Sequence, residues 1–264
     1  MATRGSFRML VATFISVSLI CAIFGAPLND AGTSANVMEW QQAGTYFQGD
    51  MVLNSEQTEA LDTDKTDHTA LIGPQYLWPQ NTVYYVIKTE DFTAQQQAQI
   101  KAGMAEIEAN SCIKFVPRTT QKNYVYITGN NSGCWAVLGY QTNDINYLNL
   151  NGCWVHGSIV HELLHTLGFV HMQSSSDRDF YVTIDWSAIQ DGADGNFVRY
   201  WSIQINDLGV PYDYESVMHY GATAFGKNGQ QTIIPHEPGV QIGLREKMSF
   251  KDIKRLNKLY PQCN

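Results

Sequence analysis

The segment from His161 to His171 constrains this chain more than any other feature. It consists of His-Glu-Leu-Leu-His-Thr-Leu-Gly-Phe-Val-His. His161 and His165 are four residues apart, so on a helix both imidazoles project from the same face. The apolar residues between and around them indicate a buried helix, and Gly168 permits the unusual backbone that ends it. The chain can then turn so that His171 returns as a third ligand.

Three imidazoles in this spacing predict a site for one zinc ion. Three protein ligands leave a coordination position open for water, which distinguishes a catalytic zinc site from a closed structural one. Glu162 follows the first ligand, where it can reach a bound water without ligating the metal. Downstream, Ser216-Val-Met218-His-Tyr220 supplies the Met-turn that accompanies this long histidine motif. The remaining histidines lack such a context and are expected to be structural or surface residues, namely His68, His156, His219 and His236.

The N-terminus has the pattern of a secretory signal peptide over residues 1–25. Arg4 and Arg8 precede a short apolar stretch, and the small residues Gly25 and Ala26 follow it. The alternative is a single membrane anchor, but the stretch is shorter than the about 20 apolar residues that a spanning helix needs. We therefore expect a secreted, extracellular protein with no membrane association once the signal is removed.

Four of the five cysteines remain after signal removal: Cys112, Cys134, Cys153 and Cys263. An even number in a secreted chain predicts two disulfides, and three connectivities are open. Asn130 begins a glycosylation sequon and should therefore lie on the surface. A net charge of −8 argues against a nucleic-acid partner, since such proteins need a basic face.

Most of that negative charge belongs to residues 26–68. The segment is polar, weakly periodic and offers little that could form a core. Its one basic residue, Lys65, stands against eight acids, namely Asp30, Glu39, Asp50, Glu56, Glu59, Asp62, Asp64 and Asp67. Composition alone leaves two interpretations open, a disordered linker and a removable pro-segment.

Residues 69–264 contain the signals of one α+β domain. Strands are predicted over residues 82–88, 113–116, 124–128 and 146–150, where β-branched and aromatic residues are dense. Thr93 with Gln96 and Ser249 with Asp252 are capping boxes, which predict helices from residue 93 to about residue 110 and from residue 249 onward. The second half of the domain is rich in loops.

The chain resembles the astacins, a family of secreted zinc endopeptidases within the metzincins, from about residue 47 to its end. Beyond the zinc motif and Met-turn, the resemblance rests on Tyr76-Leu-Trp-Pro, Cys112-Ile-Lys-Phe-Val-Pro-Arg-Thr-Thr, Ser132-Gly-Cys-Trp, Asn151-Gly-Cys and Asp177-Arg-Asp. It implies a twisted, mostly β N-terminal half with two long helices and a loop-rich C-terminal half, flanking an active-site cleft. It also implies a monomer that hydrolyses internal peptide bonds of proteins or peptides.

The resemblance assigns roles to individual residues. His161, His165 and His171 would bind zinc, Glu162 would be the general base, and Tyr220 would stabilise the transition state above the floor formed by Met218. The disulfides would be Cys112–Cys263 and Cys134–Cys153. The edge strand around residues 134–137, with Cys134 and Trp135, would pair with an extended substrate. Arg245 is a candidate for the pocket that receives the residue after the scissile bond, although a surface arginine is an equal alternative.

The same comparison interprets the acidic segment as an inhibitory pro-segment. In Phe47-Gln-Gly-Asp50-Met51, Asp50 would occupy the open position of the zinc and keep a zymogen inactive until an activating protease removes residues 26–68. Two positions depart from the family pattern: Met172 replaces a glutamate that contacts the new N-terminus, and Ser175 replaces an arginine. The rival interpretation of the whole chain is a secreted, zinc-stabilised binding module without catalysis.

Overall fold

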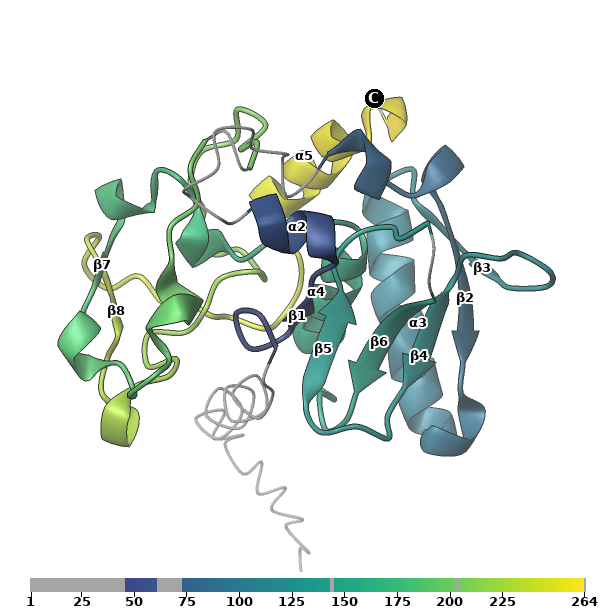
Figure 1. The fold of residues 1–264 in the computed structure, drawn as a ribbon, viewed down its shortest axis with the longest axis horizontal. Coiled ribbons are helices and arrows are strands. Elements are labelled where there is room, and N and C mark those ends of the chain that lie inside the picture. Colours follow the sequence, from purple (N-terminus) through teal and green to yellow (C-terminus); the bar gives the residue numbers. More distant parts are fainter. Residues whose placement is uncertain (1–45, 61–72, 143–144, 203–204, 264) are drawn as a thin grey trace, which may run out of the picture.

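The computed structural model describes residues 46–60, 73–142, 145–202 and 205–263. The predicted signal peptide and the region around Lys65 lie outside these residues. Within the described residues, no helix has the length and apolar character needed to cross a membrane. Figure 1 shows two halves on either side of helix α4 (His156–Thr166), with a sheet on the right and a loop-rich half on the left.

The sheet of the N-terminal half has six strands in the order β1-β5-β6-β4-β2-β3. Its strands are β1 (Met51–Val52), β2 (Thr82–Ile87), β3 (Lys114–Pro117), β4 (Val125–Thr128), β5 (Cys134–Val137) and β6 (Asn146–Leu150). Strand β5 runs antiparallel to β6, whereas all other neighbours, including β1 and β5, are parallel. Strand β5 would therefore be the edge of the sheet if β1 were absent.

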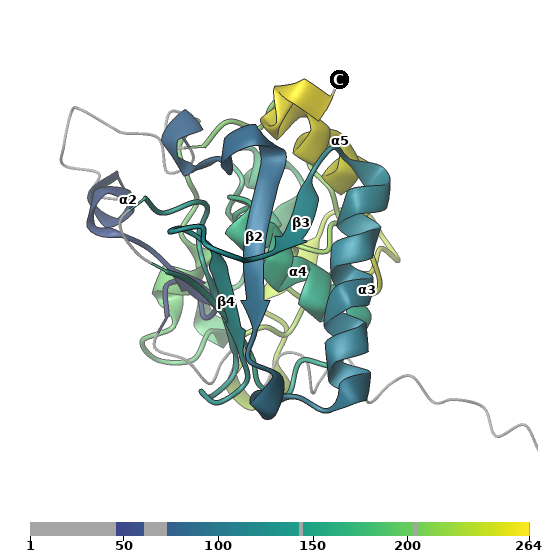
Figure 2. The same cartoon turned by 90° about the vertical axis from the view of Figure 1, so that its right-hand side faces the viewer.

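Helices α3 (Ala94–Asn110) and α4 pack against the sheet and against each other, as Figure 2 shows. Their apolar faces and the inward side chains of the strands form the largest core cluster. The two helices approach closely at Gly103, where an added Cβ would lie 2.9 Å from the Cγ2 of Ile159. A larger residue at this position would push α4 away, and α4 carries two of the predicted metal ligands.

The C-terminal half is held by a second apolar cluster and by a small antiparallel sheet. This sheet pairs β7 (Val182–Ile184) with β8 (Ile233–Pro235). The final helix α5 (Phe250–Leu259) leaves this half and packs on the main core through Leu256. It thereby connects the loop-rich half to the sheet-bearing half.

The predicted elements are present with shifts of one or two residues at their ends, and the predicted α+β class is confirmed. Both capping boxes form, with Thr93 and Ser249 accepting hydrogen bonds from the backbone of the third helical residue. Ile100, Met104 and Ile107 are buried along the apolar face expected for α3.

The acidic segment differs from expectation, because its described part does contribute to a core. Met51 is fully buried, and helix α2 (Ser55–Ala60) packs Gln57 and Ala60 against the domain. The side chain of Gln57 donates to the carbonyl of Leu138 at 3.1 Å. For residues 46–60, the interpretation as a disordered linker is therefore wrong. The composition of the segment does not reveal this, because the few residues that make the contacts, Met51, Gln57 and Ala60, stand among many polar and acidic residues.

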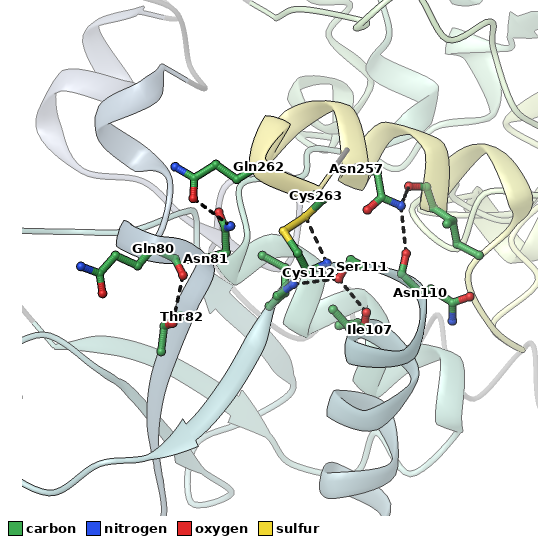
Figure 3. Close-up of a disulfide and its surroundings, with 12 residues drawn as sticks. Gln80, Asn81, Thr82, Ile107, Asn110, Ser111, Cys112, Asn257, Gln262 and Cys263 are labelled. Atoms are coloured by element: carbon green, nitrogen blue, oxygen red, sulfur yellow. Dashed lines mark hydrogen bonds between the residues drawn. A yellow bond between two sulfur atoms is a disulfide. The ribbon is translucent and has the colours of Figure 1, made fainter.

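Two disulfides tie distant segments together, in the pairing that the resemblance implies. Cys112, just after α3, is bonded to Cys263 at the end of the chain (Figure 3). Hydrogen bonds reinforce this junction, since the Asn257 amide donates to the carbonyl of Asn110 at 2.9 Å. Cys134, which begins β5, is bonded to Cys153, just before α4.

The two disulfides should differ in their effect on stability. Replacing Cys112 and Cys263 with serine opens a loop spanning 151 residues, and we expect a loss of about 5 kcal/mol in the chain-entropy model. Replacing Cys134 and Cys153 opens a span of 19 residues, with an expected loss of about 3 kcal/mol. Urea unfolding of both double variants measures the difference. A larger loss for the shorter loop would contradict this account.

Candidate metal centre

Helix α4 presents His161 and His165 toward the same buried point. The Nδ1 atoms lie 2.9 Å from the carbonyl oxygen of Val217 and 2.7 Å from that of Phe169, respectively. A carbonyl only accepts hydrogen bonds, so each Nδ1 carries the proton and each Nε2 is left with a bare lone pair. These two Nε2 atoms are 3.0 Å apart.

The third histidine arrives after a sharp turn of the chain. Gly168 has a φ of +97°, a conformation that side chains disfavour, and it ends α4 as predicted. The turn brings the Nε2 of His171 to 3.3 Å from that of His161. The amide of Met172 donates to the carbonyl of Met218 at 3.0 Å, which fixes this loop to the Met-turn.

Asp50 provides a carboxylate at the same point, although it is 111 residues before His161. Its oxygens lie 3.2 Å from the Nε2 of His161, 3.5 Å from that of His165 and 3.1 Å from that of His171. All four side chains are buried, and their potential ligand atoms lie within 4.8 Å of one another. The structure therefore unites the three predicted histidines with the predicted aspartate.

This donor set fits a metal cation. Bare imidazole nitrogens and a carboxylate repel one another when they face a common centre without a positive charge. Burial lowers the pKa of His161 well below its usual value and that of His171 to about 4, so both are neutral at pH 7, the form that binds metal. Three histidines and one carboxylate are suitable for tetrahedral zinc.

Glu162 lies beside the metal ligands and has an unusual environment. It is buried, and its Oε2 has no hydrogen-bond partner among the described residues. Burial raises its pKa well above the usual value, and the Asp50 carboxylate adds to this effect. A buried carboxyl oxygen without a partner beside a metal site is available to a bound water or substrate.

Arg245 is part of this site and is not a surface residue. Its side chain is only 6% exposed, and its charge acts on both Asp50 and Glu162. Gly157 makes this placement possible, because its amide donates to the carbonyl of Arg245 at 3.0 Å and an added Cβ would lie 2.1 Å from the Arg245 backbone. The alternative of a surface arginine is therefore wrong.

The Met-turn lies against the metal-binding histidines, and Asp252 fixes its position. Met218 is buried within the main core and has no ligand role, since its side chain belongs to the apolar cluster. Asp252 accepts hydrogen bonds from the Ser216 hydroxyl at 2.6 Å and from the Val217 amide at 2.8 Å. It also caps α5, so one carboxylate fixes both the turn and the start of the last helix.

Tyr220 points its hydroxyl toward the acidic segment that carries Asp50. The hydroxyl donates to the carbonyl of Gln48, while the Tyr220 amide donates to the Oε1 of Gln173 at 3.2 Å. Burial raises the pKa of Tyr220 well above its usual value, with a further contribution from Asp50, so the phenol keeps its proton and acts as a donor.

Sequence reasoning missed three residues around the metal centre. The Gln48 amide accepts from the Nδ1 of His171 at 3.0 Å and donates to the Ser174 hydroxyl at 2.9 Å. Gln173 holds the backbone of Tyr220, and Asp252 holds the Met-turn. Of these three residues, only Asp252 belongs to a pattern that the sequence shows, the capping box of the last helix. For the two glutamines, the contacts span too much sequence for any local pattern to predict them.

The other predicted site residues lie outside the cluster of metal ligands. Cys134 and Trp135 are buried in β5, and the Trp135 ring is 4.8 Å from that of Tyr46 in the acidic segment. Asn130 is exposed, as its sequon requires. Met172 is buried in the apolar cluster of the C-terminal half.

The remaining described histidines do not belong to the metal centre. His219 is buried and pairs with the Tyr212 hydroxyl at 2.7 Å, whereas His156 pairs with Glu106 at 2.5 Å. His236 is exposed and lies 2.8 Å from the Thr183 hydroxyl. His68 lies outside the described residues.

Comparisons with known proteins agree with this geometry. Residues 70–261 match the family model for astacin, peptidase family M12A. The zinc metalloproteinase nas-4 of Caenorhabditis elegans is 35% identical over 82% of this chain and 69% of its own length. Seminal metalloprotease 1 of Drosophila melanogaster is 39% identical over 81% of this chain and 86% of its own length. The chain spans only 42% of another relative, nas-14 of Caenorhabditis elegans, which is 40% identical over 77% of this chain.

A solved structure has the same fold. High choriolytic enzyme 1 from Oryzias latipes, a hatching enzyme zinc-protease, has a TM-score of 0.65 and 38% sequence identity, over 71% of this chain and 94% of its own. The matched family model covers the metal ligands, Glu162 and the Met-turn. This chain therefore belongs to the astacin family, peptidase family M12A, and is a zinc metalloendopeptidase of that family.

Proposed function

We propose that this chain is a secreted endopeptidase made as a latent zymogen, which hydrolyses internal peptide bonds of extracellular proteins. The observation that carries the proposal is the convergence of His161, His165 and His171 on one buried point. The Asp50 carboxylate lies at the same point, where it would fill the fourth position of a bound zinc. The three histidines explain how the site can bind a catalytic zinc ion. An acidic side chain from a removable segment at the same point explains why the uncleaved chain would be inactive.

The protein residues have separate tasks in the proposed reaction. The three histidines hold the zinc, which when bound lowers the pKa of water and polarises a carbonyl. Glu162 accepts the proton of the attacking water and delivers it to the leaving amine. Tyr220, protonated at neutral pH, donates a hydrogen bond to the oxyanion once the Gln48 carbonyl has left.

The substrate would occupy the edge of β5. The amides of Ala136 and Leu138 donate to the carbonyls of Asp50 and Val52 at 2.9 and 3.0 Å. When the pro-segment is removed, these donors become free for an extended peptide, which Cys134 and Trp135 would flank. Latency therefore has two parts, occupation of the metal site and occupation of the strand edge.

The organisation of the chain supports secretion followed by activation. The signal pattern over residues 1–25 and two disulfides in the domain are typical of the extracellular environment. Residues 26–68 would be the pro-segment and 69–264 the catalytic domain, a monomer with a sugar at Asn130. Because Met172 is apolar and buried, activation would not depend on an ion pair between this position and the new N-terminus.

The general-base role predicts the behaviour of Glu162→Ala. This variant keeps every metal ligand, so the purified protein should retain one zinc per chain. Its peptidase activity should fall by about 10³-fold or more, since general-base catalysis is worth about 10²–10⁴-fold. Glu237→Ala, at an exposed position, is the matched control.

Metal analysis and a fluorogenic peptide assay provide the two readouts for Glu162→Ala and its control. Normal turnover by zinc-loaded Glu162→Ala would exclude this mechanism, and a zinc-loaded, cleaved wild-type chain with no chelator-sensitive peptidase activity would favour the rival binding module.

Latency should depend on Asp50. In the uncleaved chain, Asp50→Ala should raise peptidase activity at least tenfold, because the metal site gains an open position while the rest of the segment still binds weakly. Glu59→Ala removes an exposed acid from the same segment and should leave the chain latent. Activity is measured before cleavage, with the chain length verified by mass spectrometry. If uncleaved Asp50→Ala were as inactive as the wild type, the aspartate would not be the switch.

Arg245 is proposed to select an acidic side chain after the scissile bond. Its buried charge lies near Asp50 and Glu162 and would pair with a substrate carboxylate at higher affinity than an exposed arginine could. In cleavage profiling of a peptide library, Arg245→Ala should lose the acidic preference, and Arg245→Lys should retain part of it. The melting temperatures of both variants verify folding. An unchanged profile in folded Arg245→Ala would eliminate this role.

A further inference from the structure

A third apolar cluster is separate from the two main cores. Its buried members are Met51, Leu138, Tyr200 and Ile205, with Phe47, Leu53 and Val170 packed beside them. Three of these residues, Phe47, Met51 and Leu53, belong to the proposed pro-segment. The others belong to the domain. This cluster is therefore the part of the described core that would be divided by activation.

The cluster lies beside the metal centre, between the end of β5 and the loop that follows His171. Met51 follows Asp50 in the chain and is paired with Ala136 of β5. Leu138 extends the edge strand on one side. On the other side, the Tyr200 amide donates to the carbonyl of Ser174 at 2.8 Å, which attaches it to the loop that follows His171. The Met51 side chain, which occupies this pocket, thus directly follows in sequence the Asp50 carboxylate that lies against the metal ligands.

We propose that Leu138, Tyr200 and Ile205 form a substrate subsite for a large, flexible apolar side chain such as methionine or leucine, which Met51 fills in the latent chain. This inference rests on the proposed peptidase function. Met51 is 0% exposed, so the pocket encloses a complete methionine side chain. Removing the segment uncovers this apolar surface and the adjacent strand donors together. An extended peptide that binds along the same strand edge accepts hydrogen bonds from these donors again. If it carries an apolar residue at that position, its side chain also covers the apolar surface again.

Tyr200 provides an independent indication of a ligand. Its side chain is 1% exposed, yet its hydroxyl has no hydrogen-bond partner among the described residues. Burial raises the pKa of Tyr200 well above its usual value, and the Asp50 carboxylate contributes, so the phenol remains a donor. An apolar pocket with one unpaired donor in its wall has the composition of a binding site for a residue that presents a main-chain carbonyl.

The test uses the full chain with a site-specific protease sequence in place of residues 64–68, so that the pro-segment can be removed on demand. The mature protein is profiled on a library of peptides that varies the positions on both sides of the scissile bond. We expect one position to favour methionine or leucine over glycine or aspartate by roughly tenfold or more in kcat/KM. Ile205→Ala enlarges the pocket and should shift that preference toward phenylalanine. Ile234→Ala, at an exposed position in β8, should leave it unchanged.

Tyr200→Phe separates the hydroxyl from the packing of the ring. We expect a several-fold increase in KM with little change in kcat, because the lost hydrogen bond serves binding. The melting temperature of the latent chain should not fall, since no partner of the hydroxyl is lost. A fall in melting temperature with an unchanged KM would show a purely structural hydroxyl and overturn the binding role of Tyr200.

A synthetic peptide with the sequence of residues 46–60 provides a readout that does not depend on turnover. It should bind the mature protein, and its Met51→Ala form should bind at least tenfold more weakly, whereas a Thr58→Ala form should bind normally. An active mature enzyme without an apolar preference near the scissile bond, or one unaffected by Ile205→Ala, would overturn the subsite. A mature protein without any peptidase activity would instead overturn the proposed function, and the peptide binding would still report on the pocket.

Discussion

The structure depends on three imidazole nitrogens and one carboxylate oxygen pair that face one another in a buried space. Each imidazole is fixed from outside: His161 and His165 by main-chain carbonyls, and His171 by the Gln48 amide. Such an arrangement is unfavourable without a cation, because each lone pair has lost its water and faces others of the same sign. A bound metal therefore stabilises the folded arrangement of this region, in addition to its part in the reaction.

The need to hold that centre explains how the two halves of the chain are joined. Helix α4 supplies two ligands and belongs to the main core, and the Met-turn lies against it from the loop-rich half. Asp252 links the turn to α5, which is attached in turn to the end of α3 by the Cys112–Cys263 disulfide. The metal centre is thus braced by helices and crosslinks, although much of the C-terminal half lacks regular secondary structure.

Much of this could be predicted because the relevant signals are local. The spacing of His161, His165 and His171 requires a helix followed by a turn, and the two capping boxes mark where α3 and α5 begin. Asp50 was found through a short motif that resembles a family pattern. The burial of Arg245, by contrast, depends on its backbone contact with Gly157, which lies 88 residues earlier. The amide of Gln48 and the pocket around Met51 also arise from contacts between distant segments, for which a single sequence gives no periodic signal.

The short pairing of β1 with β5 also affects how the molecule behaves in solution. A sheet that ended at β5 would present the amides of Ala136 and Leu138 beside an apolar surface, an arrangement that recruits strands from other chains. Strand β1 covers this edge with a strand of the same chain. A surface that would receive extended peptides, as proposed above, is also a surface prone to aggregation, and β1 keeps it covered in this structure.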